Sequence, residues 1–499
     1  MAATASALAL LAPACAASDG LVEEPAPTPT AATPTECTPA GDGVDCVEPD
    51  RDAGDEGIGD PYYPGYGNGG YDVQHYDIAV EWFPETETLS GDTTVRATTT
   101  QELSQFNLDL QLAVKTVTVD DVEAAYEQAG RELVVTPASP LPADTPVTVR
   151  VTYEGAPADL DDSAWHLTTD GAVLAGEPES ASVWYPSNDH PRDKATFDIA
   201  VTAPHGMDVV SNGRLVGSDP SDAVGGVTRR WRVTSPMATY LAYVALGDFR
   251  FERGRTTNGV PYVYAISEHL GTVEAPAFAS LRASADVLDV FEAEFGPYPF
   301  DIAGGTLANV DFGFALENQT RPIYSTVFFS RRNVEVVAHE LAHQWFGNSV
   351  SVTSWSDIWL NEGFATWASW LYRVRTRDVA KTMAEDLLAR QLRSVYARAQ
   401  DETAFWELPI GDPGPDDLFA EPVYFRGGMA VQALRNRIGV REHSELLRTW
   451  LRRHRDDDAS VDDFISLAEQ VSGEELDGFF DAWLFSTTAP EATEANGLA

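Results

Sequence analysis

Two histidines one helical turn apart are the residues of this sequence best suited to chemistry. They are His339 and His343, in the run VVAHELAHQWFGNSV. In a helix both imidazoles leave the same face, at a separation that suits two corners of one tetrahedral metal site. Glu340 lies between them, where it could not join that face as a ligand but could take a proton from a water at the metal. The alternative is an ordinary amphipathic helix, because so short a pattern also arises by chance.

A third ligand is predicted at Glu362. It lies in the run TSWSDIWLNEGFATWASWLY, at the expected start of a second helix. A catalytic zinc takes three protein ligands and leaves a fourth position for water, so two histidines and one glutamate complete the set. We therefore expect one Zn²⁺ per chain. The alternative for Glu362 is a carboxylate favoured at a helix N-terminus by the helix dipole.

The segments that must position these residues begin with a β-rich part. From Tyr71 to about residue 250, short runs rich in Val, Thr and aromatic residues are separated by Gly, Pro and Asp. Several of them alternate between apolar and polar residues, as in YDVQHYDIAVEWF and PVTVRVTYEG. This pattern is typical of an antiparallel β-sandwich.

Helical spacing begins after residue 250. From Pro276 to Phe295 apolar residues recur at steps of three and four, and Gly296-Pro297 is placed to end the segment. We expect one packing helix here, with Pro276 in its first turn. More helices are expected near the C-terminus, and Ser460 with Asp463 is typical of a capping box. Their predicted ranges are 428–438, 444–454, 461–471 and 476–484.

The first 70 residues are expected to lie outside the folded domains. Residues 1–18 are predicted to be a signal peptide or a lipoprotein signal, and Cys15 is the candidate for a lipid anchor. Residues 19–70 are Pro/Thr-rich and acidic, which predicts a linker. Within it, Cys37 and Cys46 would form a disulfide in an oxidising compartment. We therefore expect an exported protein, extracellular or at the cell surface.

Charge excludes some classes of partner. The net charge is −45, from 33 basic and 78 acidic residues, and the pI is near 4.3. Such a chain repels nucleic acid and anionic membrane surfaces. A negative cleft would also attract the protonated amine of a peptide. We predict no transmembrane segment and a monomer.

The run HELAHQW followed by WLNEGFAT resembles the gluzincin zinc aminopeptidases of the aminopeptidase N and leukotriene hydrolase type, in a short, exported bacterial form. The resemblance extends from about Tyr71 to the C-terminus. It implies an α+β multidomain fold in which the N-terminal β-sandwich, residues 71–250, precedes a thermolysin-like zinc peptidase domain. That catalytic domain, residues 251–499, would end in the predicted α-helices.

The resemblance also implies residues that bind the amino terminus of a substrate. Where the family has a G-x-M-E-N signature, this chain has Phe314-Ala315-Leu316-Glu317-Asn318, which matches at Ala315, Glu317 and Asn318 only. We expect Glu317 to face the substrate's α-ammonium, as a charge-assisted contact that lets an exopeptidase count from the free amine.

A second acidic contact is expected from the β-rich domain. In the segment AGEPESASVWYPSNDHPRDKATF, Glu177 takes the position of the family's acidic residue that reaches into the active site. Ala175 stands where the family often has Gln, so that further contact is absent here. The alternative for Glu177 is an ordinary loop carboxylate before a proline.

The resemblance assigns an oxyanion donor as well. In EPVYFRGGMAVQALRNRIG, which is similar to the family's Y-x-K-G segment, Tyr424 would direct its phenol to the scissile carbonyl, and Arg426 replaces the usual Lys. Without the resemblance, Tyr424 would be taken as a packing residue. Asp357 is close enough in sequence to Glu362 to be a hydrogen-bond partner of a ligand histidine.

Together these features predict a zinc-dependent aminopeptidase acting on peptides with a free N-terminus. Glu340 would be its base and Tyr424 its oxyanion donor. Two alternatives stay open from the sequence. One is an endopeptidase with the same zinc site, because Phe314 and Leu316 depart from the family's signature. The other is a non-catalytic exported protein that binds zinc, although a structural site usually has four protein ligands.

Overall fold

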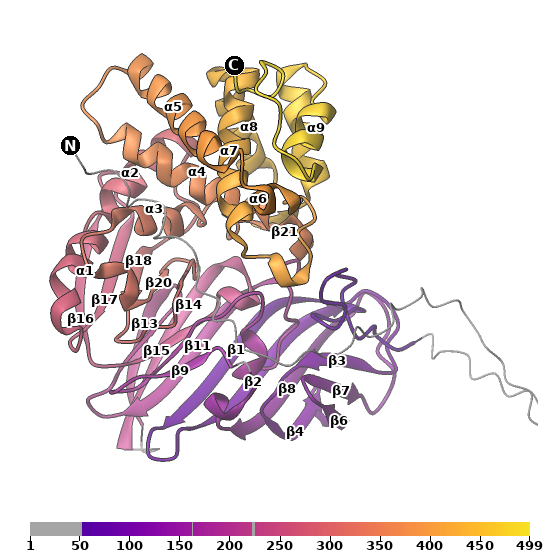
Figure 1. Ribbon diagram of the computed structural model, residues 1–499. Coiled ribbons are helices and arrows are strands. Elements are labelled where there is room, and N and C mark those ends of the chain that lie inside the picture. Colours follow the sequence, from indigo (N-terminus) through magenta and orange to yellow (C-terminus); the bar gives the residue numbers. More distant parts are fainter. Residues whose placement is uncertain (1–51, 162, 222–224) are drawn as a thin grey trace, which may run out of the picture.

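Strands fill the first half of the folded chain and helices most of the second (Figure 1). The computed structural model describes residues 52–161, 163–221 and 225–499. The predicted signal, the Cys15 anchor and the Cys37–Cys46 disulfide lie outside these residues. Among the described residues, no helix combines the length and the apolar character needed to cross a membrane.

A large twisted sheet forms the base of the first domain. Strand β1 (Tyr71–Phe83) alternates buried and exposed residues along most of its length, as expected for a strand with one face on a core. The expectation of a purely antiparallel sandwich is wrong at one pairing, because β1 runs parallel to β11 (Lys194–Pro204). Strands far apart in sequence can pair in this way, since a long connection joins them.

The remaining strands of this domain complete three sheets. The eight-stranded sheet has the order β13-β14-β11-β1-β2-β8-β4-β5, the four-stranded sheet β12-β15-β10-β9 and the three-stranded sheet β3-β7-β6. Their bounds are β2 Thr88–Thr99, β3 Phe106–Asp109, β4 Ala113–Val119, β5 Val122–Glu123, β6 Ala125–Ala129, β7 Glu132–Thr136, β8 Pro146–Gly155, β9 Trp165–Leu167, β10 Ala172–Leu174, β12 Asp208–Ser211, β13 Arg214–Ser221, β14 Gly226–Ala238 and β15 Val244–Gly247.

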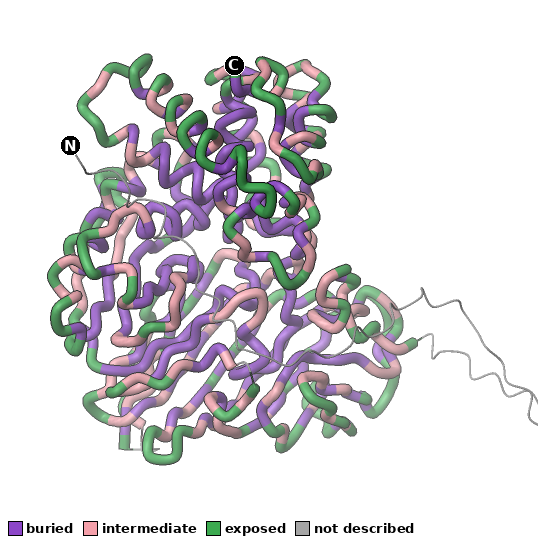
Figure 2. The backbone as a smooth tube through the Cα atoms, viewed as in Figure 1, coloured by how far each residue is buried: buried purple, intermediate pink, exposed green. Residues whose placement is uncertain are grey.

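The second domain begins with a five-stranded sheet at β16, close to the boundary expected at residue 250. Its order is β16-β17-β18-β20-β19, so β19 is an edge strand. Helices cover it and continue to the C-terminus, with their inward faces buried (Figure 2). The strands are β16 Phe249–Arg255, β17 Pro261–Ser267, β18 Ala303–Leu307, β19 Ala315–Leu316 and β20 Ile323–Tyr324, with the separate pair β21 Val350–Val352 and β22 Asp457–Ala459.

The helices differ from the predicted ranges at their ends. The segment expected to be one helix from Pro276 to Phe295 forms two helices, α1 and α2. The break arises because the N–H of Ala283 bonds to the carbonyl of Ser280, three residues back, instead of four as in an α-helix. The capping box of Ser460 and Asp463 is present. The helices are α1 Glu274–Leu281, α2 Ser284–Phe295, α3 Val334–Ala342, α4 Trp359–Arg375, α5 Lys381–Ala399, α6 Thr403–Glu407, α7 Glu421–Ile438, α8 Val440–Arg453, α9 Val461–Ser472 and α10 Asp477–Phe480.

Part of the predicted linker is folded. Residues 52–70 pack against the body of the protein, and Asp60 is 2% exposed. Its carboxylate lies 3.0 Å from Nε2 of His190 in the first domain and accepts the N–H of Trp355 in the second at 2.9 Å. The expectation of a linker is therefore wrong for this stretch, because these polar contacts and the packing of Tyr62 and Tyr63 against the core hold a Pro/Gly-rich segment in place.

A half-buried lysine also joins the two domains. Lys194, at the start of β11, donates its ammonium to the carbonyls of Asn348 at 2.9 Å and Ser349 at 3.0 Å. Both carbonyls belong to the turn that follows α3. The first domain thus holds the backbone next to the predicted metal ligands.

Helices α4 and α7 cross at two glycines. A Cβ on Gly427 would lie 2.7 Å from Cα of Gly363, and one on Gly363 would lie 2.9 Å from Cα of Gly427. Real Cβ atoms essentially never come this close to backbone, so only glycine allows the crossing. Since Gly363 follows Glu362 and Gly427 lies one turn after Tyr424, the crossing sets the distance between these two candidate site residues.

Replacing Gly427 by alanine is expected to destabilise the protein by about 1–3 kcal/mol, because the added methyl group forces the two helices apart. The matched control is Gly478→Ala in α10, where a Cβ meets nothing within 4 Å. That control should be neutral or stabilising by up to about 1 kcal/mol, from helix propensity. Urea unfolding midpoints of the two variants measure both effects, and equal midpoints would contradict the close crossing.

Candidate active site

Two packed helices bring the three predicted metal ligands together. Helix α3 carries His339 in its last turn and His343 at its C-terminal cap, and it begins at Asn333, whose side chain accepts the N–H of Val336. Helix α4 carries Glu362 in its first turn. All three side chains are buried, and their ligand atoms lie within 4.8 Å of one another.

The hydrogen bonds of the histidines orient their ring nitrogens. Nδ1 of His343 lies 3.1 Å from the carbonyl of Phe346, which requires a proton on Nδ1 and leaves the Nε2 lone pair free. Nε2 of His339 and of His343 lie 3.0 and 3.6 Å from Oε2 of Glu362. Burial lowers the pKa of His343, but the neighbouring carboxylates of Glu317 and Glu362 outweigh it and raise this pKa to about 10, so a metal would displace a proton from this ring. Two imidazoles and one carboxylate facing one point form the donor set of a catalytic zinc, so these residues fit that ion.

A second triplet, of Glu317, Glu340 and His343, could also hold a cation by proximity. There the nearer nitrogen of His343 is Nδ1, at 3.9 Å from Glu317, and this nitrogen is already bonded to the Phe346 carbonyl. The first triplet is therefore the better metal site. It leaves Glu317 and Glu340 free for other roles.

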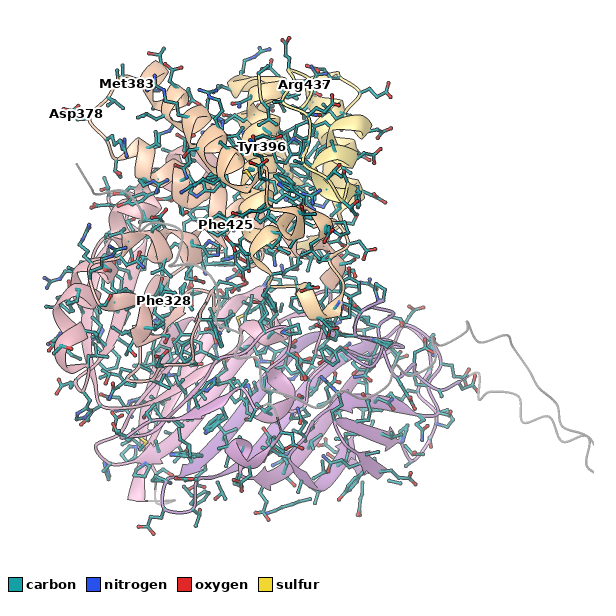
Figure 3. The ribbon with its side chains drawn as sticks, viewed as in Figure 1. Phe328, Asp378, Met383, Tyr396, Phe425 and Arg437 are labelled. Atoms are coloured by element: carbon teal, nitrogen blue, oxygen red, sulfur yellow. The ribbon has the colours of Figure 1, made fainter. Side chains whose placement is uncertain are left out.

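The triplet opens into a cavity of about 230 Å³. One part of its wall carries four carboxylates, those of Glu177, Glu317, Glu340 and Glu362. The rest is mainly apolar. The apolar wall comes from separate segments of the chain. One of its residues is Phe328, in the 3-10 turn of residues Thr326–Phe329 (labelled in Figure 3). The others are Phe314, Ala315, Leu316, Val336 and Phe419.

Burial of these carboxylates disturbs their ionisation. Burial and repulsion from neighbouring carboxylates raise the pKa of Glu177, Glu317 and Glu340. Burial acts in the same direction on Glu362, but the two histidines outweigh it and lower the pKa of Glu362 to about 2. Positive charge in this cavity would therefore be strongly favoured.

Glu317 is held from several sides. Its Oε1 accepts the hydroxyl of Tyr240 at 3.3 Å, and its backbone carbonyl accepts the side-chain amides of Gln344 at 2.9 Å and Asn348 at 2.7 Å. Sequence reasoning missed these three supporting residues. Gln344 and Asn348 follow the histidine motif closely, and this nearness could have marked their side-chain amides as candidates. Nothing in the sequence connects Tyr240 to the site.

Glu177 reaches the same cavity from the first domain. Its Oε1 is buried and has no hydrogen-bond partner within the described parts of the chain. A buried carboxylate oxygen without a donor is costly unless a ligand supplies one. Glu177 and Glu317 thus offer two acceptors to a cationic group in the cavity.

Two other predictions do not agree with the structure. Asn318 lies behind the cavity wall, fully buried, and its side chain donates to the carbonyl of Leu241 at 3.0 Å. Asp357 accepts the N–H of Val461 at 3.1 Å instead of bonding to a ligand histidine. Asn318 was assigned from the family's signature and Asp357 from its nearness in sequence, and each bonds to backbone from a distant part of the chain.

Tyr424 lies in the first turn of α7 beside His339. The two rings have their centroids 5.9 Å apart and are 26° from parallel. Burial and the nearby carboxylates raise the pKa of the Tyr424 phenol, which therefore stays protonated and able to donate. The neighbouring Arg426 is fully buried and donates to four backbone carbonyls, among them those of Trp483 and Leu408, so it anchors α7 and does not face the cavity.

The curated relatives of this chain are larger proteins. Aminopeptidase M1 of Arabidopsis thaliana is 28% identical over 328 residues, which are 62% of this chain and 36% of the relative. Glutamyl aminopeptidase of Bitis rhinoceros is 28% identical over 333 residues, with 62% and 34% covered. The chain thus spans about a third of the length of these relatives.

A solved structure of similar size also matches. It is an M1 zinc metallopeptidase of Deinococcus radiodurans, crystallised as a mutant bound to a Tyr-Ser-Ala substrate. The TM-score is 0.77 at 26% sequence identity, covering 88% of this chain and 100% of the other.

Family models match both domains. The Peptidase M1 N-terminal domain matches residues 72–241, and the Peptidase family M1 domain matches residues 314–483, which include all three predicted metal ligands. Since both domains match in the family's order and the fold matches a solved M1 zinc metallopeptidase from end to end, the chain belongs to peptidase family M1.

Proposed function

We propose that this protein is a zinc-dependent aminopeptidase that hydrolyses the N-terminal peptide bond of peptides. The observation that carries the proposal is the group of four carboxylates around one cavity. Only Glu362 is needed as a metal ligand and only Glu340 as a base. Glu177 and Glu317 remain as acceptors for the α-ammonium of a substrate.

Zinc held by His339, His343 and Glu362 would supply Lewis acidity toward the attacking water and the scissile carbonyl. Glu340 takes a proton from the water and passes it to the leaving amine. Its raised pKa suits this double role, because a carboxyl that is harder to ionise holds and returns a proton more readily. Tyr424 donates its hydroxyl to the oxygen that becomes negative as the carbonyl is attacked.

The carboxylates of Glu317 and Glu177 hold the amino terminus, so the cleaved bond is the first one. The free edge of β19 lies beside them, with Ala315 on the cavity wall. An exposed strand edge can pair with the extended backbone of a peptide. The apolar walls around Phe314, Phe328 and Phe419 favour an apolar N-terminal side chain.

Location and assembly stay predictions from the sequence alone. We propose export through residues 1–18, with the mature protein extracellular or at the cell surface, and a monomeric enzyme. A lipid anchor at Cys15 is the alternative to a free protein.

The test of the activity uses two fluorogenic peptides that differ only in an acetyl group on the α-amine. The proposal predicts cleavage of the free-amine peptide alone, loss of cleavage with a chelator and recovery with zinc. Equal cleavage of both peptides would indicate the endopeptidase alternative, because an internal bond needs no free amine. No cleavage of either with zinc bound would support the non-catalytic zinc-binding protein.

Replacing the base separates chemistry from binding. Glu340→Gln should keep zinc and lower kcat by about 10²–10⁴-fold, because it removes the proton acceptor and keeps the shape of the side chain. The matched control is Glu335→Gln on the solvent side of the same helix, where the carboxylate accepts a hydrogen bond from Arg373. Zinc content and kcat of both variants decide the assignment, and near-normal kcat in zinc-loaded Glu340→Gln would refute it.

A further inference from the structure

Residues 60–66, called the strap below, lie before the matched family range that begins at residue 72. The strap has the sequence DPYYPGY, with tyrosines at 62, 63 and 66. Although it was expected to be linker, it contacts both domains. Nothing in the proposed reaction uses it.

Asp60 fixes the start of the strap. Its carboxylate accepts the N–H groups of Tyr62 at 2.8 Å and Tyr63 at 3.1 Å, which closes a local turn. The same carboxylate accepts the N–H of Trp355, just before α4, and contacts the ring of His190. One buried carboxylate therefore ties the strap to both domains.

On the catalytic side, the strap holds the loop before α7. The hydroxyl of Tyr62 donates to the carboxylate of Asp412 and accepts the N–H of Gly414 at 2.9 Å. The hydroxyl of Tyr63 donates to the carbonyl of Pro415 at 3.1 Å. This loop continues to Phe419, which lines the cavity.

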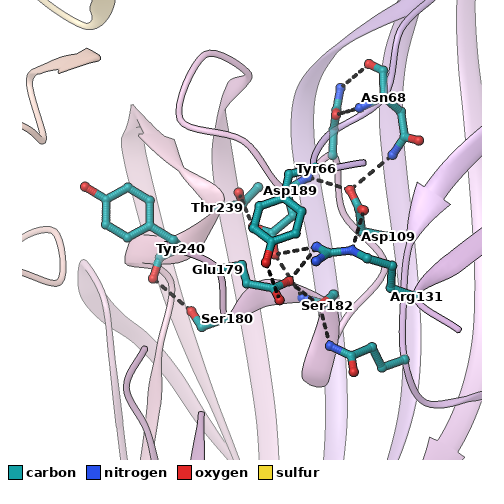
Figure 4. A network of polar contacts seen from close by, with 12 residues as sticks. Tyr66, Asn68, Asp109, Arg131, Glu179, Ser180, Ser182, Asp189, Thr239 and Tyr240 are labelled. Carbon is teal, nitrogen blue, oxygen red and sulfur yellow. Dashed lines mark hydrogen bonds and ion pairs between the residues drawn. The ribbon is translucent and has the colours of Figure 1, made fainter. Parts of the chain in front are cut away.

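On the other side, the strap holds the loop that carries Glu177. The Tyr66 ring stacks on Tyr63 with centroids 4.5 Å apart, and its hydroxyl donates to Glu179 at 3.1 Å. The guanidinium of Arg131 lies 4.0 Å from the centroid of the Tyr66 ring and 2.5 Å from the Glu179 carboxylate. Figure 4 shows Tyr66, Arg131 and Glu179 in this arrangement.

The same network continues to the second amine acceptor. Ser180, next to Glu179, donates to the carbonyl of Tyr240 at 3.1 Å (Figure 4). The hydroxyl of Tyr240 in turn donates to Glu317. Tyr66 is thus connected through hydrogen bonds to the loop of Glu177 and to Glu317. Tyr62 is connected to the loop that ends at Phe419.

We propose that the strap is a positioning element of the substrate cleft, which fixes two of its walls through separate tyrosines. Tyr62 positions the Phe419 wall, which contacts the N-terminal side chain of the substrate. Tyr66 positions the Glu177 loop, which contacts the α-ammonium. This inference rests on the proposed aminopeptidase function and assigns two positioning residues to it.

The test compares Tyr62→Phe, Tyr66→Phe and a matched control, Tyr126→Phe. Each variant loses one oxygen atom. The Tyr126 hydroxyl donates to the carbonyls of Val114 and Lys115, and Tyr126 does not line the cavity. We measure kcat and KM with L-phenylalanyl and L-alanyl p-nitroanilide. Tyr62→Phe should raise KM for the phenylalanyl substrate about three- to tenfold and change the alanyl substrate little. Tyr66→Phe should raise KM for both substrates by a similar factor, since both carry the amine.

A purely structural role would lower the thermal midpoint and the apparent kcat but leave KM unchanged. The inference is overturned if KM in both variants equals that of Tyr126→Phe, or if the two variants affect the two substrates alike. Inactivity of the zinc-loaded wild type would instead refute the proposed function. In that case the strap is tested by calorimetric binding of L-phenylalanine and L-alanine. Tyr62→Phe should then weaken binding of L-phenylalanine only, and Tyr66→Phe should weaken binding of both amino acids.

Discussion

Four carboxylates buried around one small cavity are the constraint on which the rest of the structure depends. Carboxylates in contact with each other and away from water cannot all ionise unless positive charge joins them. The two histidines cannot supply it while they bind a metal, because a ligand imidazole must be neutral. A divalent cation and one ammonium group would together neutralise three of the four charges. The charge of the cavity therefore suits both the metal and the amine of the proposed reaction.

Holding this arrangement requires elements from both domains. Glu177 comes from the first domain, whereas Glu317, Glu340 and Glu362 come from the second. Polar contacts join the two domains, notably those of Asp60 with His190 and Trp355 and those of Lys194 with the turn after α3. Within the second domain, the close crossing of α4 and α7 at Gly363 and Gly427 determines the distance between Glu362 and Tyr424. Polar and close-packed contacts of this kind fix the positions of the segments that line the cavity.

The sequence was informative where the signal is local. Helical spacing was enough to predict that His339 and His343 share one face of a helix. Glu362 was predicted from the number of ligands that a catalytic zinc takes, and the structure brings its carboxylate to the two histidines. The positions of Glu177 and Glu317 came from the family resemblance, since loops in different domains carry them. Periodicity could not reveal that they share a cavity.

Other features depend on partners too distant in sequence to infer. Asp60 lies in a segment with the composition of a linker, and its partners are 130 and 295 residues away. Asp357 was expected near a histidine but caps α9, because its position in the fold is set by that helix. The break between α1 and α2 arises from a single three-residue hydrogen bond at Ala283, which the spacing of apolar residues cannot predict.

The most direct measurement of the central claim is calorimetric binding of L-phenylalaninamide and of 3-phenylpropionamide, which lacks only the amine, to the zinc-loaded Glu340→Gln protein. If Glu177 and Glu317 accept the ammonium, the amine-bearing ligand should bind at least about tenfold more tightly, as a hydrogen-bonded charge requires. Equal affinities would contradict the account, because the two carboxylates would then have no amine to hold.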